Sequence, residues 1–312
     1  MNMPLDDFAK IFELADDEIS ALQRILATPA IMKIAEDIAE TTLIPERPAP
    51  LPEYPESPEL SEAFFAAAYL SCDASRQHFK RLGIPDAVWQ ETMTDFKLWL
   101  RHEIRYHQLY GLGPRSRHWE TKILRGGIIR LGRLECELEN HYRFADLKTA
   151  DGKVILSAGD PVINLHIPAA GPMDIAECGK SMRRMAEFFA LHRPDYQWKG
   201  FLCESWLLDL QLRPMLPPDS NILKFQGLGH NYIIQESDDI IFRIFGYDDP
   251  AAMTDPTGLQ RQVWEFICSG NHFRSSGMFL PRHIAETAEF DPERIAEKIA
   301  AITLIPESQP VR

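Results

Sequence analysis

Hydrophobic residues in the segment 174–191 recur at intervals of three and four, which is typical of an amphipathic helix. Largely apolar runs at 162–167 and 200–208 lie on either side of this segment and predict two strands. A strand, a helix and a strand in this order predict a parallel pair with a right-handed crossover. Ligands of such sheets bind beyond the carboxyl ends of the parallel strands. We therefore expect the functional site where these two strands end.

The turn at 168–172 leads from the first strand into the helix. Small residues and a glycine allow a ligand to approach the backbone, and the unpaired N–H groups of the first helical turn suit a phosphate. An ordinary turn followed by a solvated basic helix face is the alternative, and on these residues alone it is the simpler interpretation. The candidate cofactor-binding residues are Ile167, Ala169, Ala170, Gly171, Asp174 and Lys180.

Polar residues at the strand ends are the candidates for chemistry. Glu204 is the first candidate for a general base, because a carboxylate beside a cleft can have a raised pKa; a solvated or ion-paired glutamate is the alternative. Cys203 and Ser205 point to the face opposite Glu204, because side chains alternate along a strand. The candidate catalytic residues are Glu204, His166, Ser205, Cys203 and Tyr232.

Each remaining candidate also has two interpretations. His166 acts as a base, directly or through water, or it is a histidine hydrogen-bonded within the strand ends. Cys203 forms a nucleophilic pair with His166, as in a cysteine-dependent hydrolase, or it is a small buried apolar residue. Tyr232 is a candidate acid only because of its position in the next predicted strand.

The order of patterns predicts an α+β or α/β chain, in which an all-helical domain precedes a mixed sheet flanked by helices. We place the helical domain at 1–118, with a proline-rich connector at 45–58, and the mixed domain at 119–312. Helices are predicted at 5–44, 60–70, 75–82, 85–104, 257–268 and 283–302. Strands are predicted at 126–131, 134–139, 153–156, 221–226, 231–235 and 240–245, with a hairpin turn at 151–152 and a half-buried strand at 134–139.

Charge and cysteine content exclude several classes of function. The 312 residues carry a net charge of −13, which argues against nucleic-acid and anionic membrane partners. Five cysteines without CxxC spacing, together with an acidic N-terminus, predict a reduced, cytoplasmic protein. No metal site is predicted, because His102 and His107 are not four residues apart.

Three segments carry a resemblance to a family: LHIP at 165–168, FLCESWLLD at 201–209 and LPPDSNILKFQ at 216–226. They resemble a bacterial group of proposed N-acyltransferases in which a helical N-terminal domain precedes a GNAT-like C-terminal domain. The segments 82–96, 124–139 and 259–281 are similar to the same group.

The resemblance implies direct acyl transfer from acyl-CoA to an amine of a small molecule or peptide. Pantetheine would follow the strand at 162–167, and the pyrophosphate would lie at the turn after it. The glycine-rich pyrophosphate loop of the superfamily is replaced here by Pro168-Ala-Ala-Gly-Pro172. A non-catalytic small-molecule-binding or regulatory protein on the same fold is therefore the alternative function.

Overall fold

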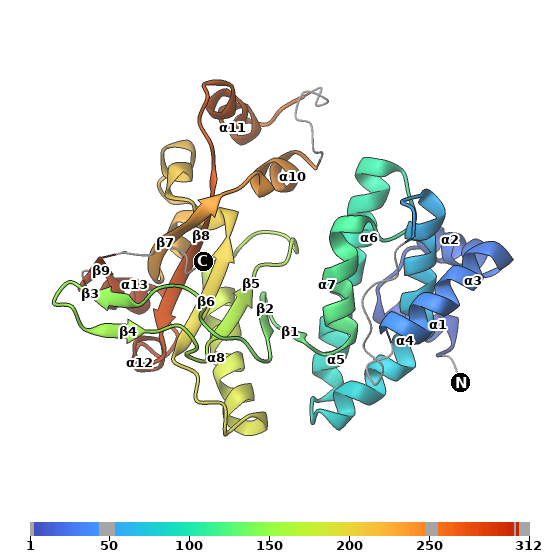
Figure 1. Cartoon of the computed structure of the whole chain (residues 1–312), viewed down its shortest axis with the longest axis horizontal. Helices are drawn as coiled ribbons and strands as arrows, with labels where there is room; N and C mark the ends of the chain where they lie inside the picture. Colours follow the sequence, from blue (N-terminus) through green and yellow to red (C-terminus); the bar gives the residue numbers. More distant parts are fainter. Residues whose placement is uncertain (1–2, 44–53, 247–254, 303, 306–312) are drawn as a thin grey trace. The chain divides into compact units, whose positions relative to one another are not determined.

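The computed structural model describes residues 3–43, 54–246, 255–302 and 304–305, and it divides into two compact units (Figure 1). The first unit contains Met1–Leu131 and Pro168–Ala170, and the second contains Gly132–Ile167 and Gly171–Arg312. The predicted boundary at 118 falls inside a helix, Pro114–Leu124, that belongs to the first unit. Residues 45–53 of the predicted proline-rich connector lie outside the described residues.

The first unit is built almost entirely of helices. Its longest, α4, begins where the hydroxyl of Ser57 accepts a hydrogen bond from the backbone N–H of Leu60 at 3.1 Å and Pro58 occupies the first helical position. α4 covers both helices predicted at 60–70 and 75–82. The elements are α1 (Leu5–Ile11), α2 (Asp16–Leu26), α3 (Pro29–Ile38), a π-helical turn (Ala39–Leu43), α4 (Pro58–Arg81), α5 (Asp86–Met93), α6 (Asp95–His107), α7 (Pro114–Leu124) and β1 (Ile128–Leu131).

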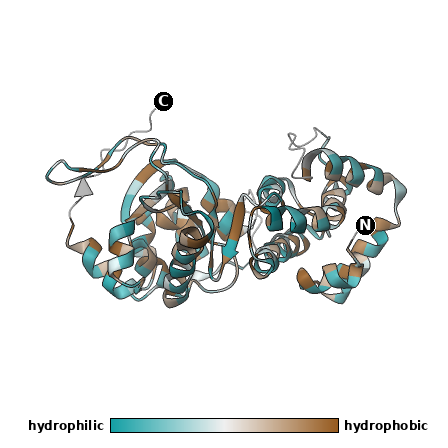
Figure 2. Cartoon of the chain, turned by 90° about the horizontal axis from the view of Figure 1, so that it is seen from below, coloured by the Kyte–Doolittle hydropathy of each residue, from teal (hydrophilic) through white to brown (hydrophobic). Residues whose placement is uncertain are grey.

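The long helix predicted at 85–104 is divided at Thr94. The Thr94 hydroxyl donates a hydrogen bond to the carbonyl of Glu91 at 2.7 Å, and the chain starts again as α6 at Asp95. α6 ends at Gln108, whose φ of 57° is left-handed. The following loop, which includes Gly113, leads into α7. Figure 2 shows hydrophilic and hydrophobic residues on the same helices, as amphipathic packing requires.

The second unit contains a mixed sheet with strand order β2-β5-β6-β8-β7. β5 and β6 are parallel, and the other neighbouring pairs are antiparallel. A second sheet has the order β4-β3-β9. The strands are β2 (Leu134–Glu137), β3 (Leu147–Thr149), β4 (Val154–Leu156), β5 (Ile163–His166), β6 (Gly200–Ser205), β7 (His230–Glu236), β8 (Arg274–Pro281) and β9 (Leu304–Ile305).

α8 (Ile175–His192) connects the two parallel strands, as predicted. Asp174 is its N-cap and accepts a hydrogen bond from the backbone N–H of Glu177 at 3.0 Å. The buried residues of α8 repeat at helical spacing: Cys178, Gly179, Ser181, Met182, Met185, Phe188 and Phe189. The remaining helices of this unit are α9 (Asn221–Gln226), α10 (Asp239–Phe245), α11 (Gly258–Cys268), α12 (Arg282–Thr287) and α13 (Pro292–Ala300), with 3₁₀ helices at Trp206–Leu208 and Leu210–Met215.

Two predicted strands are helices. The segment 221–226 forms α9, because the Ser220 hydroxyl accepts the N–H of Ile222 and begins a helical turn. The segment 240–245 lies within α10, where Ile240 and Phe245 pack into an apolar cluster with Leu212, Val263 and Phe273. Short apolar runs have no distinctive period, so burial in three dimensions decides between helix and strand.

Two further expectations need correction. The helix predicted at 283–302 is two helices, because Glu289 and Phe290 between α12 and α13 have positive φ values. The strand predicted as half-buried at 134–139 also buries Glu135, which is 1% exposed. The broader prediction is confirmed: a helical N-terminal region is followed by a mixed sheet flanked by helices. Among the described helices, none combines the length and apolar character needed to cross a bilayer.

Candidate functional site

The parallel strands β5 and β6 part near their carboxyl ends. The last registered pair between them is Leu165 with Cys203. β6 continues to Ser205, where its registered partner is Ser276 on β8. After Leu165 the backbone of β5 is therefore no longer paired with β6, and this is where the sequence predicts an opening.

Strand register decides which candidates share a face, because directly paired residues point the same way and neighbours along a strand alternate. Asn164 pairs with Leu202, which places His166 and Glu204 on one face. Gly277 pairs with both Glu204 and Tyr232, so Tyr232 projects from this face too. Three of the five candidate catalytic residues thus lie on one face of the sheet.

Glu204 is mostly buried, with 21% of its side chain exposed. Burial raises the pKa of its carboxyl above the ordinary value; the nearby Glu137 carboxylate raises it further, and the Arg143 guanidinium opposes both. Arg143 forms an ion pair with Glu204 and is itself 68% exposed. Glu204 is therefore a carboxylate with a raised pKa, paired with a cation that lies largely in solvent.

His166 is held by a polar network on the same face. Its Nε2 atom lies 3.0 Å from the Oε1 atom of Glu137 on β2. The amide nitrogen of Asn164 lies 3.4 Å from the same oxygen, and the amide of Asn140 donates to the other Glu137 oxygen at 2.9 Å. Glu137 thus orients the imidazole, in the way that a carboxylate fixes a histidine tautomer in other sites.

Tyr232 lies in an aromatic cluster beside Glu204. Its ring centroid is 6.2 Å from that of Tyr142 and 5.7 Å from that of Phe144. Burial is the main cause of the strongly raised Tyr232 pKa, and the Glu204 carboxylate adds to it. The Tyr232 hydroxyl is buried and has no hydrogen-bond partner among the described residues. This phenol stays neutral and keeps its proton available.

The geometry separates Cys203 from His166. Cys203 is 1% exposed and points to the opposite face, where Cys178 of α8 is nearby. Burial raises the pKa of the Cys203 thiol, which opposes formation of a thiolate. The Ser205 hydroxyl accepts the N–H of Leu207 at 3.2 Å and so caps the 3₁₀ helix after β6. Cys203 and Ser205 therefore have structural roles, in packing and in capping, on the face opposite Glu204.

The turn before α8 combines an open glycine with an acidic cap. Gly171 has a φ of 75°, is exposed, and has no atom within 4 Å of where a Cβ would stand. The carboxylate of Asp174 accepts a hydrogen bond from the N–H of Glu177, one of the groups that would otherwise bind an anion. The guanidinium of Arg133 donates to the carbonyls of Gly171 and Pro172 at 3.2 and 3.0 Å, which brings positive charge to this turn.

The other predicted cofactor-binding residues are near this turn in sequence but differ in environment. Ile167 is half-buried and directly follows β5, and Ala169 is exposed. Ala170 is half-buried and belongs with Ala169 to the first compact unit. Lys180 is exposed and pairs with Glu177 at 2.6 Å along the helix.

Comparisons with known families account for nearly the whole arrangement. Residues 3–126 match the N-acyltransferase N-terminal domain, and residues 128–280 match the GNAT-like C-terminal domain. The chain therefore carries an N-acyltransferase N-terminal domain followed by a GNAT-like C-terminal domain. The bacterial origin implied by the resemblance stays a prediction.

Solved structures from this fold group are similar over most of their length. An acyltransferase mutant in complex with octanoyl-CoA is 22% identical, with a TM-score of 0.68 over 89% of this chain and 87% of that one. An acyltransferase in complex with decanoyl-CoA and teicoplanin is 23% identical, with a TM-score of 0.67 over 89% of this chain and 88% of that one. These likenesses establish the fold. A search of curated proteins finds no match.

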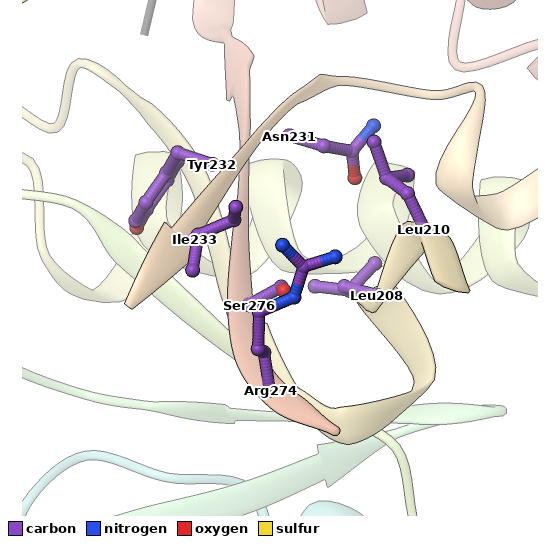
Figure 3. A pocket seen from close by; sticks show the side chains of 7 residues that line it. All are labelled: Leu208, Leu210, Asn231, Tyr232, Ile233, Arg274 and Ser276. Atoms are coloured by element: carbon purple, nitrogen blue, oxygen red, sulfur yellow. The ribbon is translucent and has the colours of Figure 1, made fainter. Parts of the chain in front are cut away.

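A cavity lies along β7 and β8 (Figure 3). It has a volume of about 220 Å³ and is lined by Leu208, Leu210, Asn231, Tyr232, Ile233, Arg274 and Ser276. Ile233 pairs with Ser276, and both alternate with the Tyr232–Gly277 pair, so they project from the other face of the sheet. The Tyr232 ring is directed away from Arg274 in Figure 3. This cavity therefore lies mainly on the face opposite Glu204 and His166, and Tyr232 is the lining residue that projects from their face.

Several functional candidates are absent from the sequence prediction. Glu137 was part of an alternating acidic strand, and only the β2–β5 register shows that it meets His166. Arg143 and Tyr142 lie in a segment with no predicted element, yet both act on Glu204 or Tyr232. The one sequence feature that points to Glu137 is the alternation of apolar and acidic residues around Cys136, because Glu137 is one of the acidic residues in it.

Proposed function

We propose that this protein is an N-acyltransferase that transfers an acyl group directly from acyl-CoA to an amine. The observation that carries the proposal is the shared face of Glu204 and Tyr232 where β5 and β6 part. The two domain matches and the acyl-CoA complexes of structurally similar acyltransferases support it.

Glu204 has the surroundings of a general base. The acceptor amine must lose a proton to attack the thioester carbonyl, and a carboxylate with a raised pKa accepts that proton more readily than an ordinary one. The attack forms the C–N bond of the amide, and collapse of the tetrahedral intermediate breaks the C–S bond. His166, oriented by Glu137, is the alternative base on the same face.

Tyr232 has the surroundings of the acid. The departing CoA thiolate needs a proton, and the Tyr232 hydroxyl has no hydrogen-bond partner among the described residues. Its raised pKa keeps the phenol neutral, so it donates a hydrogen bond to the sulfur as negative charge develops there and passes its proton only as the C–S bond breaks. After the reaction Glu204 releases the proton that it took from the amine, and Tyr232 regains a proton. Both exchanges involve solvent, which reaches the partly exposed Glu204 side chain. Glu204 and Tyr232, both on this face, supply the two proton transfers without Cys203.

The substrate class follows from the same comparisons. We propose a medium-chain acyl-CoA donor, since the similar structures hold octanoyl- and decanoyl-CoA, and an amine on a small molecule or peptide as acceptor. We place the pyrophosphate at the turn containing Gly171, with Arg133 supplying positive charge. A cytoplasmic location also stays a prediction.

The test measures turnover and binding separately. The full chain is incubated with octanoyl-CoA and a panel of amines, and acylated products and free CoA are quantified by mass spectrometry. We expect acyl transfer to at least one amine, and a loss of about 10²-fold or more in kcat for Glu204→Gln. Cys203→Ala is the matched control and should retain turnover, because Cys203 points to the opposite face.

One observation favours the alternative function. The Asp174 carboxylate stands at the N-terminus of α8, where it disfavours a pyrophosphate. A protein that has lost acyl-CoA chemistry would show no thermal stabilisation by CoA or octanoyl-CoA and no product with any amine. That combined result would overturn the acyltransferase proposal in favour of a small-molecule-binding protein.

A further inference from the structure

The last turns of α6 in the helical unit bring together two histidines and a glutamate. One ligand atom from each of His102, Glu103 and His107 can be chosen so that all three lie within 4.8 Å of one another. The spacing of His102 and His107 alone argues against a metal site, but Glu103 and His107 are four residues apart and share a helix face. His102, next to Glu103, completes the group.

Glu103 is the buried member of this group. Glu103 is 6% exposed, and no hydrogen bond to its carboxylate is formed by the residues that the structure describes. His107 and Arg117 both act on the Glu103 carboxylate through their charge, but the N–H groups of Arg117 donate elsewhere. They donate to the carbonyl of Leu112 at 2.9 Å, to Glu56 at 2.8 Å and to Ser61 at 2.8 Å.

The surroundings hold this carboxylate in place. A Cβ at Gly113, the N-cap of α7, would lie 2.1 Å from the Oε1 atom of Glu103, so the loop passes directly against the carboxylate. The left-handed Gln108 ends α6, and the N–H of Leu109 returns to the carbonyl of Glu103 at 3.4 Å. A buried anion that is fixed in this way is costly unless a cation compensates it.

The two imidazoles differ in access. His102 is half-buried, and its ring centroid lies 4.7 Å from that of Tyr106 and 6.2 Å from that of His107. His107 is exposed, which leaves a path for an ion from solvent. The group therefore has one buried anionic ligand, one packed imidazole and one imidazole that faces water.

We propose that His102, Glu103 and His107 bind a divalent transition-metal ion of the zinc type. Two imidazoles and one carboxylate suit Zn²⁺, with water completing a tetrahedral site. Ligand atoms about 2.0–2.2 Å from zinc lie roughly 3.4 Å apart, so small side-chain rotations close the present spacing. The ion compensates the Glu103 carboxylate and fastens the end of α6.

The experiment uses the full chain without a histidine tag, stripped of metal by a chelator and dialysed. Zn²⁺ is titrated by calorimetry, and the Tm is measured with and without Zn²⁺. We expect one Zn²⁺ per chain and a higher Tm, while Mg²⁺ gives neither. His107→Ala should weaken Zn²⁺ binding by at least about tenfold.

Two variants make the result decisive. His118→Ala removes an exposed histidine of α7 outside the group and should bind Zn²⁺ like the wild type. Glu103→Gln keeps the side-chain size and should also weaken binding at least about tenfold. The proposal is overturned if no Zn²⁺ binds, or if His107→Ala and Glu103→Gln, shown to be folded by circular dichroism, bind Zn²⁺ as the wild type does.

Discussion

The ring of Tyr232 lies against the α-carbon of Gly277 on the neighbouring strand. A Cβ at Gly277 would stand 2.1 Å from the Cζ atom of Tyr232 and 2.4 Å from its hydroxyl oxygen. Gly277 also pairs with Glu204 on its other side. The absence of a side chain at this position therefore allows the phenol to reach across β8 toward the carboxylate.

Replacing Gly277 with alanine should displace the Tyr232 ring. We expect a loss of stability of about 1–3 kcal/mol, typical of overpacking, and a fall in kcat.

Tyr232→Phe keeps the ring and should lower kcat by about 10²-fold or more with little loss of stability, because the hydroxyl has no hydrogen-bond partner among the described residues. Denaturant unfolding and steady-state kinetics check both. Equal kcat for Tyr232→Phe and wild type would contradict the role of the phenol.

Arg143 should set the pH at which Glu204 becomes active. Burial raises the pKa of Glu204 and Arg143 lowers it, so Arg143→Gln should raise that pKa further. A base must be ionised, so the acidic limb of the pH profile of kcat/KM should move to higher pH in Arg143→Gln. Arg143→Lys keeps the charge and should leave the limb near its wild-type position. An unmoved limb in Arg143→Gln would assign the base to another group, with His166 the first alternative.

His230 should make the fold less stable in mild acid. Burial lowers its pKa from 6.5 to about 4, so the unfolded chain takes up a proton between these values and the folded chain does not. Stability contributed by the neutral imidazole is present above pH 6.5 and is lost as the pH falls toward 4, by up to about 3 kcal/mol. In His230→Leu the decline in free energy of unfolding over this range should be smaller. Identical pH dependence in the two proteins would mean that His230 is protonated in the folded state.

Asp174 should limit affinity for CoA. Asp174→Asn keeps a side-chain acceptor for the N–H of Glu177 but removes the negative charge at the helix N-terminus. We expect KM for acyl-CoA to fall roughly two- to fivefold, with kcat unchanged. Asp174→Ala, in contrast, should cost about 1 kcal/mol of stability through the lost cap. If KM does not change in Asp174→Asn, the pyrophosphate lies away from this turn.

The sequence predicts those parts of the fold that depend on local pattern. α8 has six apolar residues at helical spacing and an aspartate cap, and it forms within one residue of its predicted start. The strand predicted at 240–245 was wrong, because an apolar run of this length suits a strand or a helix equally well. Their helix is decided by burial against Val263 and Phe273, which come later in the chain.

The candidate site shows the same limit. Strand alternation alone separates Glu204 from Cys203, and the structure has them on opposite faces. No local pattern pairs His166 with Glu137 or Tyr232 with Gly277, because these contacts depend on strand order and register. The spacing of His102 and His107 alone does not indicate the group at the end of α6, because Glu103 supplies its third ligand atom.

The position of β8 between β6 and β7 has a consequence for how the protein is made. β7 leaves the ribosome well before β8, yet β8 is its registered partner in the sheet, and β8 also covers one edge of β6. Until residues 274–281 emerge, the nascent chain exposes two strand edges that will later be paired. Ribosome-bound chains that stop before this segment should therefore be prone to pair with one another, and the final fold should form late in synthesis.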